Sequence, residues 1–486
     1  MRRLSPAALP QSADIVLPSY DRDAVSQGVV HLGVGAFHRA HQATYFEAAL
    51  RSGDTRWGIT CASLRSPGVR DSLNPQGGLY TLVEREGTAQ RLQLIGAIST
   101  VLVAPENPGA LVDAVARADT HIVTLTVTEK GYKLDPASGS LLLDDPDVAH
   151  DLQSIAAPRT APGLLVAGLM ARRAAGLPPF TAISCDNLPH NGRRLKDAVL
   201  ALAGRIDPGL ADWIEAEGAF PQTMVDRIVP ATTPDDIAAL AGRLGIEDRA
   251  MVKTEPFTQW VIEDRFSGPR PDLEAAGVQI TRSVAPWEDA KLRLLNGAHS
   301  AIAYLGGLAG LEFVHQVVAR PEGRRLVEAL WDEAAATLTP PPGLDVPAYR
   351  RALMTRFANE ALQHKTRQIA MDGSQKLPQR LLAPIAERRA RGEHVEALAL
   401  GVAAWMRWQA GVTDAGERFT VDDPLASTIA ARLGEANAPA DRVAALMAME
   451  AIFPPALAAD DELKALLTAQ LTALTERGAL AVLRSR

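Results

Sequence analysis

Residues 31–42 read HLGVGAFHRAHQ, and this stretch decides the fold of the first half of the chain. It overlaps the apolar run Val29–Leu32, which predicts a buried strand, and a helical pattern begins by His38. Gly33 and Gly35 stand where a dinucleotide-binding turn has its first two glycines, whereas His38 occupies the place of the third. The stretch therefore predicts a strand–turn–helix unit whose ligand has still to be decided.

A glycine turn that leads into a helix presents backbone N–H groups and the positive end of the helix dipole to a phosphate. Gly35 would let a pyrophosphate approach the backbone closely. His38, with Arg39 and His41 nearby, implies wider packing of helix on strand or a side chain with a task of its own. A turn that uses glycine only to change direction is the alternative, because short glycine motifs are common. The candidate cofactor contacts are Gly33, Val34, Gly35, Ala36, Phe37 and His38.

The whole chain has the composition of an ordinary globular protein. Its 486 residues are 47% hydrophobic and 22% charged, which suits two or three domains with cores of their own. The net charge of −7 argues against a nucleic-acid partner. The 2 cysteines lie in apolar runs and fit a reducing cytoplasm better than a disulfide framework or a metal site. Without a convincing signal peptide or an apolar run of about 18 residues, we expect a cytoplasmic protein with no membrane association.

Short β-branched runs alternate with helical patterns over the first half of the chain, which is typical of a mostly parallel sheet. We expect strands at 29–32, 59–64, 122–127, 181–185 and 224–229, and helices at 108–117 and 192–203. After Val284 the β-branched runs disappear, and helical spacing rich in alanine and leucine continues to the end. The sequence therefore predicts an α/β domain at 1–283 and a mainly α-helical domain at 284–486.

The strongest chemical pattern lies at this boundary, where residues 287–306 read WEDAKLRLLNGAHSAIAYLG. In an α-helix, Lys291, His299 and Asn296 would project at relative angles of about 0°, 80° and 140° and share one side. A partly buried lysine can take the proton of a secondary alcohol as hydride leaves. Asparagine can donate to the developing alkoxide, and histidine can orient the oxygen. A solvated polar face is the alternative, since most lysines are exposed.

Further polar residues follow the predicted strands, at the edge where open α/β sheets bind ligands. Glu129 comes after one strand and Asn187 after another, while Asp226 lies inside a strand-like run, where a carboxylate needs a partner. Each has a structural alternative: Glu129 can pair with Lys130 at the surface, Asn187 can cap a helix, and Asp226 can be neutralised by Arg227 or another buried base.

The end of the second predicted strand bears on the choice of nucleotide. An acidic residue there commonly binds the ribose diol of NAD, but residues 63–66 read SLRS. Arg65 is a candidate contact for a 2′-phosphate, and a solvated loop arginine is an equally good interpretation. The preference between NAD and NADP therefore stays open.

The segments GVGAFHRAHQ, TVTEKGY, SCDN, MVDRIVP, KLRLLNGAH and MDGSQKLPQRLL occur in this order along nearly the whole chain. Together they resemble the polyol-specific long-chain dehydrogenases, the mannitol dehydrogenase family. The resemblance implies an N-terminal Rossmann-type domain, a mainly α-helical C-terminal domain and a metal-independent active site in the cleft. It also implies NAD as cofactor, without excluding NADP, a small sugar acid or polyol as substrate, and a monomer or weak homo-oligomer.

The resemblance also implies roles for individual residues. Lys291 is the general acid/base, Asn187 and Asn296 stabilise the oxyanion, and His299 positions the reacting oxygen. Glu129 is grouped with the cofactor contacts. The residues implied to line the site, its proton route or the substrate are Asp226, Glu288, Arg367 and Lys376.

Two segments, HKTRQIAMDGSQKLPQRLL and EPFTQWVIEDRF, are more similar to fructuronate reductase than to mannitol dehydrogenase. They imply the reaction of D-fructuronate with NADH to give D-mannonate and NAD. The substrate carboxylate needs a cation, for which Arg367, Lys376 and Arg380 are candidates, although Arg380 also fits a solvent-facing helix start. A mannitol 2-dehydrogenase or arabinitol dehydrogenase is the alternative. A nucleotide sensor with a relic site is a third, but a sensor has no use for the proton-transferring Lys291.

Overall fold

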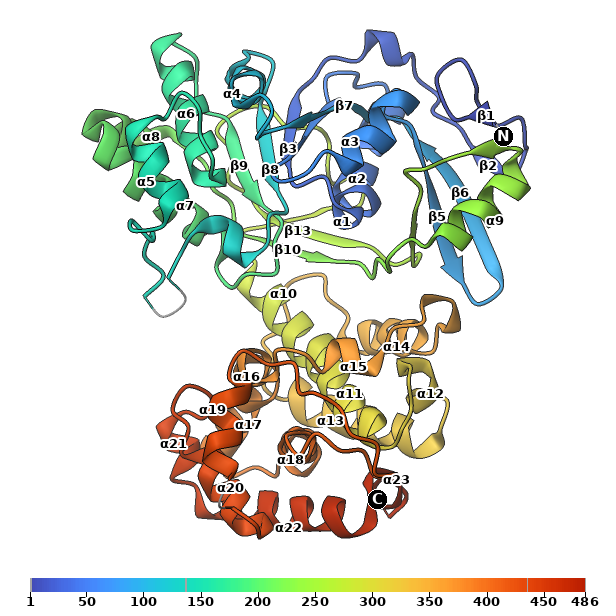
Figure 1. Cartoon of the computed structure of the whole chain (residues 1–486), viewed down its shortest axis with the longest axis vertical. Helices are drawn as coiled ribbons and strands as arrows, with labels where there is room; N and C mark the ends of the chain where they lie inside the picture. Colours follow the sequence, from blue (N-terminus) through green and yellow to red (C-terminus); the bar gives the residue numbers. More distant parts are fainter. Residues whose placement is uncertain (1, 136–137, 435, 486) are drawn as a thin grey trace. The chain divides into compact units, whose positions relative to one another are not determined.

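The computed structural model describes residues 2–135, 138–434 and 436–485. The chain forms two compact units, Met1–Val284 and Ala285–Arg486. In the described residues the strands all belong to the first unit, and the second is helical, as Figure 1 shows. This confirms the predicted fold class of an α/β domain followed by a mainly α-helical domain.

The first unit is built on a five-stranded parallel sheet in the order β7-β4-β3-β8-β9. Its strands are β3 (Val29–Leu32), β4 (Ile59–Ser63), β7 (Ile98–Val103), β8 (Ile122–Leu125) and β9 (Thr181–Ser184). The sequence predicted four of these strands to within two residues at their carboxyl ends. Strand order reverses between β3 and β8, and in open α/β sheets ligands bind outside the carboxyl ends at such a reversal.

Alternate residues of the sheet strands face two different cores, because successive side chains in a strand point to opposite faces. Val29 of β3 packs in one core with α1 (Ala36–Ala40) and α2 (Gln42–Arg51). Val30 packs in the other core with the helices on the opposite face. Those helices are α4 (Pro108–Ala116), α5 (Pro146–Gln153), α6 (Ala161–Ala174), α7 (Asn191–Ile206) and α8 (Pro208–Glu217). The predicted helices 108–117 and 192–203 are α4 and α7.

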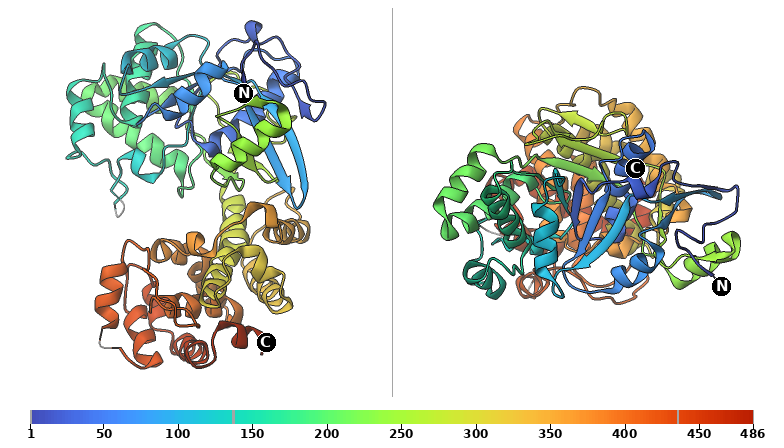
Figure 2. Two further views of the ribbon diagram at one scale, coloured as in Figure 1. Left: turned by 45° about the vertical axis from the view of Figure 1, so that its right-hand side comes forward. Right: turned by 90° about the horizontal axis from the view of Figure 1, so that it is seen from above.

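Smaller sheets complete the first unit. One has the order β12-β5-β6-β2, and its β5–β6 hairpin is the long light-blue ribbon in Figure 2. Its strands are β2 (Ile15–Val16), β5 (Tyr80–Glu86), β6 (Ala89–Ile95) and β12 (Val252–Thr254). The others join β1 (Arg2–Arg3) to β11 (Ile246–Glu247), and β10 (Thr223–Asp226) to β13 (Gln259–Glu263) and β14 (Gln279–Thr281). Two further helices are α3 (Gly68–Leu73) and α9 (Pro234–Leu244).

The strand expected at 224–229 differs from the prediction in its partners. It is β10, which ends at Asp226 and pairs antiparallel with β13 in a sheet of its own rather than in the parallel sheet. An apolar β-branched run predicts a strand but carries no information about which neighbour completes its hydrogen bonds. The sequence pattern therefore predicted the strand but not the sheet to which it belongs.

The second unit is arranged around α11 (Gly297–Leu308), all of whose residues are buried, and α18 (Glu396–Trp408), which packs against it. Around them lie α10 (Ala285–Ala290), α12 (Val314–Val318), α13 (Pro321–Ala335), α14 (Val346–Phe357), α15 (Thr366–Ile369), α16 (Gly373–Leu377), α17 (Ala383–Ala390), α19 (Ala426–Leu433), α20 (Pro439–Met447), α21 (Pro455–Ala458), α22 (Asp461–Arg477) and α23 (Ala479–Arg484). Of the helices formed by the described residues, none combines the length and the hydropathy needed to cross a membrane.

Two π-helical turns interrupt this helical unit: η4 (Lys291–Asn296) joins α10 to α11, and η6 (Pro378–Leu382) joins α16 to α17. In η4 the Gly297 N–H donates to the carbonyl of Leu292, five residues back, and in η6 the Ala383 N–H does the same to Pro378. The prediction of a regular α-helix from Lys291 was therefore wrong for its first six residues. Hydrophobic period does not distinguish an α-turn from a single wider turn, which is why the sequence did not show it.

Candidate active site

Glycine stands at two positions of the turn after β3, and the physical reason differs between them. Gly33 has φ of +98°, and a Cβ atom there would lie 2.1 Å from the carbonyl oxygen of Thr126, so the fold itself requires glycine. Gly35 is exposed at the N-terminus of α1, and a Cβ atom there would meet nothing closer than the Gly33 oxygen at 3.9 Å. No packing within the protein explains glycine at position 35. Close approach of a ligand does explain it, which is the role of the second glycine in a dinucleotide turn.

The place of the third glycine is taken by a stacked pair of histidines. The rings of His38 and His31 are 3.3 Å apart and nearly parallel, at 10°. His31 Nδ1 lies 2.7 Å from Thr124 Oγ1, and His31 Nε2 lies 3.0 Å from the Gly33 carbonyl oxygen. Burial lowers the pKa of His31 to about 3 and also lowers that of His38, so both rings are neutral. The pair joins β3, β8 and α1 beneath the turn, and His38 is thereby part of the core.

The predicted cofactor contacts therefore divide by exposure. Val34 and His38 are buried among protein groups, whereas Gly33, Ala36 and Phe37 are half-buried and Gly35 is exposed. Phe37 stacks on His41 with ring centres 5.0 Å apart. Backbone groups of this turn, rather than the side chains of Val34 and His38, are thus the part that can meet a phosphate.

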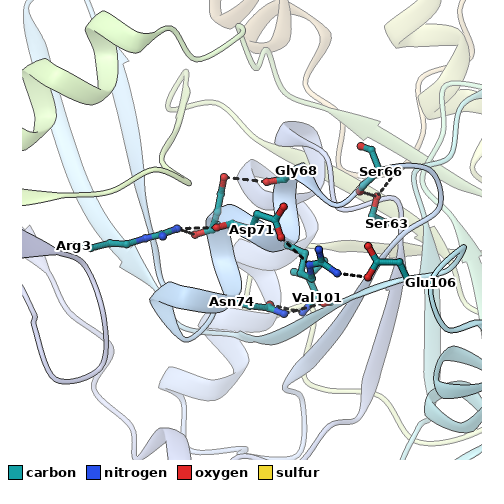
Figure 3. Close-up of polar contacts among 10 residues, drawn as sticks. Arg3, Ser63, Ser66, Gly68, Asp71, Asn74, Val101 and Glu106 are labelled. Carbon is teal, nitrogen blue, oxygen red and sulfur yellow. Dashed lines mark hydrogen bonds and ion pairs between the residues drawn. The ribbon is translucent and has the colours of Figure 1, made fainter.

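The loop after β4 stands where dinucleotide folds bind the ribose of the cofactor. Ser63 Oγ donates to the Ser66 carbonyl at 2.6 Å and closes the loop, as Figure 3 shows, while Arg65 is exposed. Asp71 and Glu106 are both bound by Arg70.

The loop after β8 is held by a carboxylate from the loop after β9. Asp186 accepts hydrogen bonds from the backbone N–H groups of Val127 at 3.1 Å and Thr128 at 2.9 Å, and from the Tyr132 hydroxyl at 2.6 Å. Thr128 has φ of +68°, an uncommon conformation for threonine that these bonds stabilise. Asp186 thus has a structural role, and it presents the neighbouring Glu129 and Asn187, which are both exposed.

Asp226 is the last residue of β10 and is buried, opposite Gln259 of β13. The candidate neutralising base, Arg227, has other partners. Its guanidinium pairs with Glu84 at 2.5 Å and donates to the carbonyl oxygen of Glu255 at 2.9 and 3.1 Å. These bonds account for the Arg227 guanidinium, and the neutralisation of Asp226 by Arg227 or by another buried base stays a prediction.

In the second unit, Lys291 and Asn296 are the first and last residues of η4, and His299 lies in the first turn of α11. Lys291 is 8% exposed and His299 6% exposed, so the solvated polar face is not the correct interpretation. Residues five apart lie about one turn apart when hydrogen bonds run from i to i+5. The π turn therefore brings Lys291 and Asn296 closer to alignment than the 140° of a regular α-helix.

His299 is surrounded by rings and cations. Its ring centre is 4.6 Å from that of Phe357 and 5.1 Å from that of His364. Burial, with smaller contributions from the charges of His364, Arg356 and Arg380, lowers the pKa of His299. Within the described residues His299 Nε2 is buried without a hydrogen-bond partner, a costly state that a ligand oxygen would relieve. The sequence gave no sign of the contacts with Phe357 and His364.

Glu288 lies in α10, one turn before Lys291. Burial raises the pKa of Glu288 from 4.5 to about 7; the Lys291 charge opposes this shift, and the Asp289 charge adds to it. A carboxyl group that changes protonation near neutral pH, next to a buried lysine, can accept or release a proton there.

The three predicted cations of the second unit differ in their hydrogen-bond and ion-pair partners. Arg367 is half exposed and pairs with Glu417 at 2.7 Å. Lys376 donates to the carbonyl of Met371 at 2.6 Å and lies 3.5 Å from the carboxylate of Asp372. Arg380, which the sequence also allowed as a solvent-facing residue, is half-buried in η6.

The chain is similar to known proteins over nearly its whole length. The sequence matches the family models of the mannitol dehydrogenase Rossmann domain over residues 27–275 and of the mannitol dehydrogenase C-terminal domain over residues 283–475. It is 45% identical over 471 residues to D-mannonate oxidoreductase of Escherichia coli strain K12, covering 96% of both chains. It is 41% identical over 447 residues to mannitol 2-dehydrogenase of Phaeosphaeria nodorum, covering 89% of this chain and 78% of that one.

A solved structure of Pseudomonas fluorescens mannitol 2-dehydrogenase, in a ternary complex with NAD and D-mannitol, is similar over 99% of both chains. The TM-score is 0.87 and the sequence identity 38%.

Proposed function

The chain belongs to the mannitol dehydrogenase family, and from this premise we propose that it interconverts D-fructuronate and D-mannonate with NAD, using Lys291 as general acid/base and no metal. It is an oxidoreductase of that family. The observation that carries the mechanism is the grouping of a buried Lys291, Asn296 and an unpartnered His299 Nε2 within one helical segment.

The glycine turn of the first unit suits the binding of NAD. The open space at Gly35, the left-handed conformation of Gly33 and the half-buried Ala36 and Phe37 leave backbone at the surface where a pyrophosphate needs it. When bound, the nicotinamide supplies or accepts the hydride. We assign Glu129, next to this turn at the carboxyl end of β8, to the cofactor side of the site.

Proton transfer is assigned to the second unit. In the reducing direction the ketone carbon gains a hydride, and the Lys291 ammonium gives its proton to the ketone oxygen; oxidation of the alcohol reverses both movements. The Asn296 amide donates a hydrogen bond to the oxygen as negative charge develops on it, without itself titrating. Neutral His299 holds the same oxygen through Nε2. Glu288 exchanges the proton of Lys291 with solvent.

The remaining assignments follow the family pattern. Asn187 is the second donor of the oxyanion pair, Asp226 lines the site, and Lys376 and Arg367 bind the substrate. Support is weakest for Arg367, because its guanidinium is already paired with Glu417 at the surface. In the three described stretches of chain, no histidine, cysteine, aspartate or glutamate side chains gather in threes that could hold an ion.

The choice of D-fructuronate is supported by the 45% identity to D-mannonate oxidoreductase. Mannitol 2-dehydrogenase activity is the second candidate, favoured by the similarity to a structure that holds NAD and D-mannitol. The two differ in a carboxylate on the substrate. We would therefore measure oxidation of NADH and of NADPH with D-fructuronate, D-tagaturonate and D-fructose in parallel. Faster reduction of fructose than of fructuronate would contradict the uronate assignment.

Replacing Lys291 tests the proton step. We expect Lys291→Ala to lower the hydride-transfer rate on the order of 10²-fold or more, because general acid/base catalysis contributes that much. Affinity for NADH, measured by fluorescence titration, should be nearly unchanged, since the cofactor contacts are in the first unit. Turnover near the normal rate would remove Lys291 from the mechanism.

A further inference from the structure

We propose that Arg380 is the residue that recognises the substrate carboxylate and so distinguishes a sugar acid from a polyol. This rests on the proposed function, because it names the substrate class of the same site. In the described residues the Arg380 side chain makes one hydrogen bond, from Nη1 to Ser300 Oγ at 3.2 Å, and no carboxylate lies at ion-pairing distance from it. A guanidinium has five donors, so most of its hydrogen-bonding capacity is unused.

Two other shielded arginines of the second unit, Arg293 and Arg389, have carboxylate partners. Arg293 pairs with Glu387 at 2.7 Å and also donates to the Thr337 carbonyl at 2.9 Å. Arg389 pairs with Asp460 at 2.7 Å. A buried charge is costly unless it is paired, and these arginines follow the rule. Arg380 does not, which is what we expect of a cation whose partner arrives with the substrate.

Asp372 does not fill this role. The charge of Asp372 influences Arg380, but the Asp372 carboxylate lies 3.5 Å from Lys376 instead. Burial lowers the pKa of Arg380 to about 10, so the guanidinium still carries its charge at neutral pH. Lys376 is thus engaged by Met371 and Asp372, and Arg380 is the cation left for an external anion.

The backbone fixes Arg380 beside the proposed catalytic segment. A Cβ atom at Gly297 would lie 2.9 Å from the carbonyl oxygen of Arg380, so glycine there lets η6 pack directly on the junction of η4 and α11. Asn296 immediately precedes Gly297, and Ser300, which holds the guanidinium, immediately follows His299. The cation is therefore joined by short, rigid connections to the groups assigned to the reacting oxygen. A planar guanidinium can take both oxygens of a carboxylate, which a lysine cannot do with the same geometry.

The test compares substrates with and without a carboxylate. We expect Arg380→Met to lower kcat/KM for D-fructuronate on the order of 10²-fold while changing that for D-fructose less than about 3-fold. Arg380→Lys, which keeps the charge, should lie between the wild type and Arg380→Met for fructuronate. Arg391→Met is the matched control, because Arg391 is half exposed and 3.9 Å from Glu387, and it should change neither value. Equal losses on both substrates, or no loss on fructuronate, would overturn the proposal.

Binding separates failure of this inference from failure of the proposed function. Calorimetric titration of the NAD-loaded enzyme with D-mannonate and D-mannitol reports carboxylate recognition without turnover. If the wild type does not reduce fructuronate, the proposed function fails. If it nevertheless binds mannonate more tightly than mannitol and Arg380→Met or Arg380→Lys reduces that preference, the role of Arg380 stands. A wild type without preference for mannonate, or variants that keep the preference in full, would refute it.

Discussion

Replacing Glu288 by glutamine should remove a pH dependence from the stability of the protein. The folded state raises the pKa of Glu288 from 4.5 to about 7, mainly by burial, against the opposing charge of Lys291. Between these values the folded chain binds more protons than the unfolded chain does. The contribution of protonated Glu288 to stability is therefore complete below about pH 4.5 and is lost as the pH rises through about 7.

The size of the effect follows from the two pKa values. With 4.5 in the unfolded chain and about 7 in the folded chain, linkage gives a loss of about 2.5 kcal/mol between about pH 5 and about pH 8. Glutamine keeps the shape of protonated Glu288 but cannot ionise. The free energy of unfolding of Glu288→Gln minus that of the wild type should thus rise by about 2.5 kcal/mol over this range.

Urea unfolding followed by tryptophan fluorescence at both pH values measures this difference. Asp289→Asn is the matched control, because Asp289 is next in sequence and its side chain is 51% exposed. The Asp289 charge is a smaller cause of the Glu288 shift than burial, so the control should keep most of the wild-type slope. The reasoning is refuted if wild type and Glu288→Gln respond to pH equally.

The glycine turn and its histidine pair give two more predictions. Gly33→Ala should destabilise the fold by about 1–3 kcal/mol, because it adds strain at positive φ and a close contact with Thr126. Gly35→Ala should keep the wild-type melting temperature but lower the affinity for NAD at least about tenfold. A Gly35→Ala variant that binds NAD normally would contradict the ligand argument. His38→Gly restores the usual third glycine, but it should lower the free energy of unfolding by about 3–5 kcal/mol because it deletes a ring stacked on His31. Unchanged stability in calorimetric melting would contradict this prediction.

Much of the architecture could be predicted from the sequence, because it depends on local pattern. Apolar β-branched runs such as Val29–Leu32 form the buried strands of the parallel sheet, and the change in spacing after Val284 marks the helical part. The quoted motifs indicated the family. In contrast, the neighbours of β10 depend on which strand is available to pair in three dimensions, and the run 224–229 contains no such information.

The candidate site was harder to predict from the sequence, because its features arise from packing between distant segments. The sequence placed His38 at a glycine position but could not show that its ring lies on His31, on the strand before the turn. It offered Arg367, Lys376 and Arg380 as candidate cations, with a solvent-facing helix start as the alternative for Arg380. Their difference depends on Glu417 and Asp372, whose contacts follow from the folded chain.

The two π turns pack against each other next to the proposed catalytic residues. In η6 the carbonyl of Pro378 accepts from the Ala383 N–H, five residues on, which makes the turn wider than an α-helical turn. Gly297 lets that widened turn pack against η4, where the Gly297 N–H likewise bonds five residues back. In a regular α-helix Lys291 and Asn296 would lie about 140° apart. The i to i+5 turn brings them closer to alignment, which favours their action on one oxygen in the proposed chemistry.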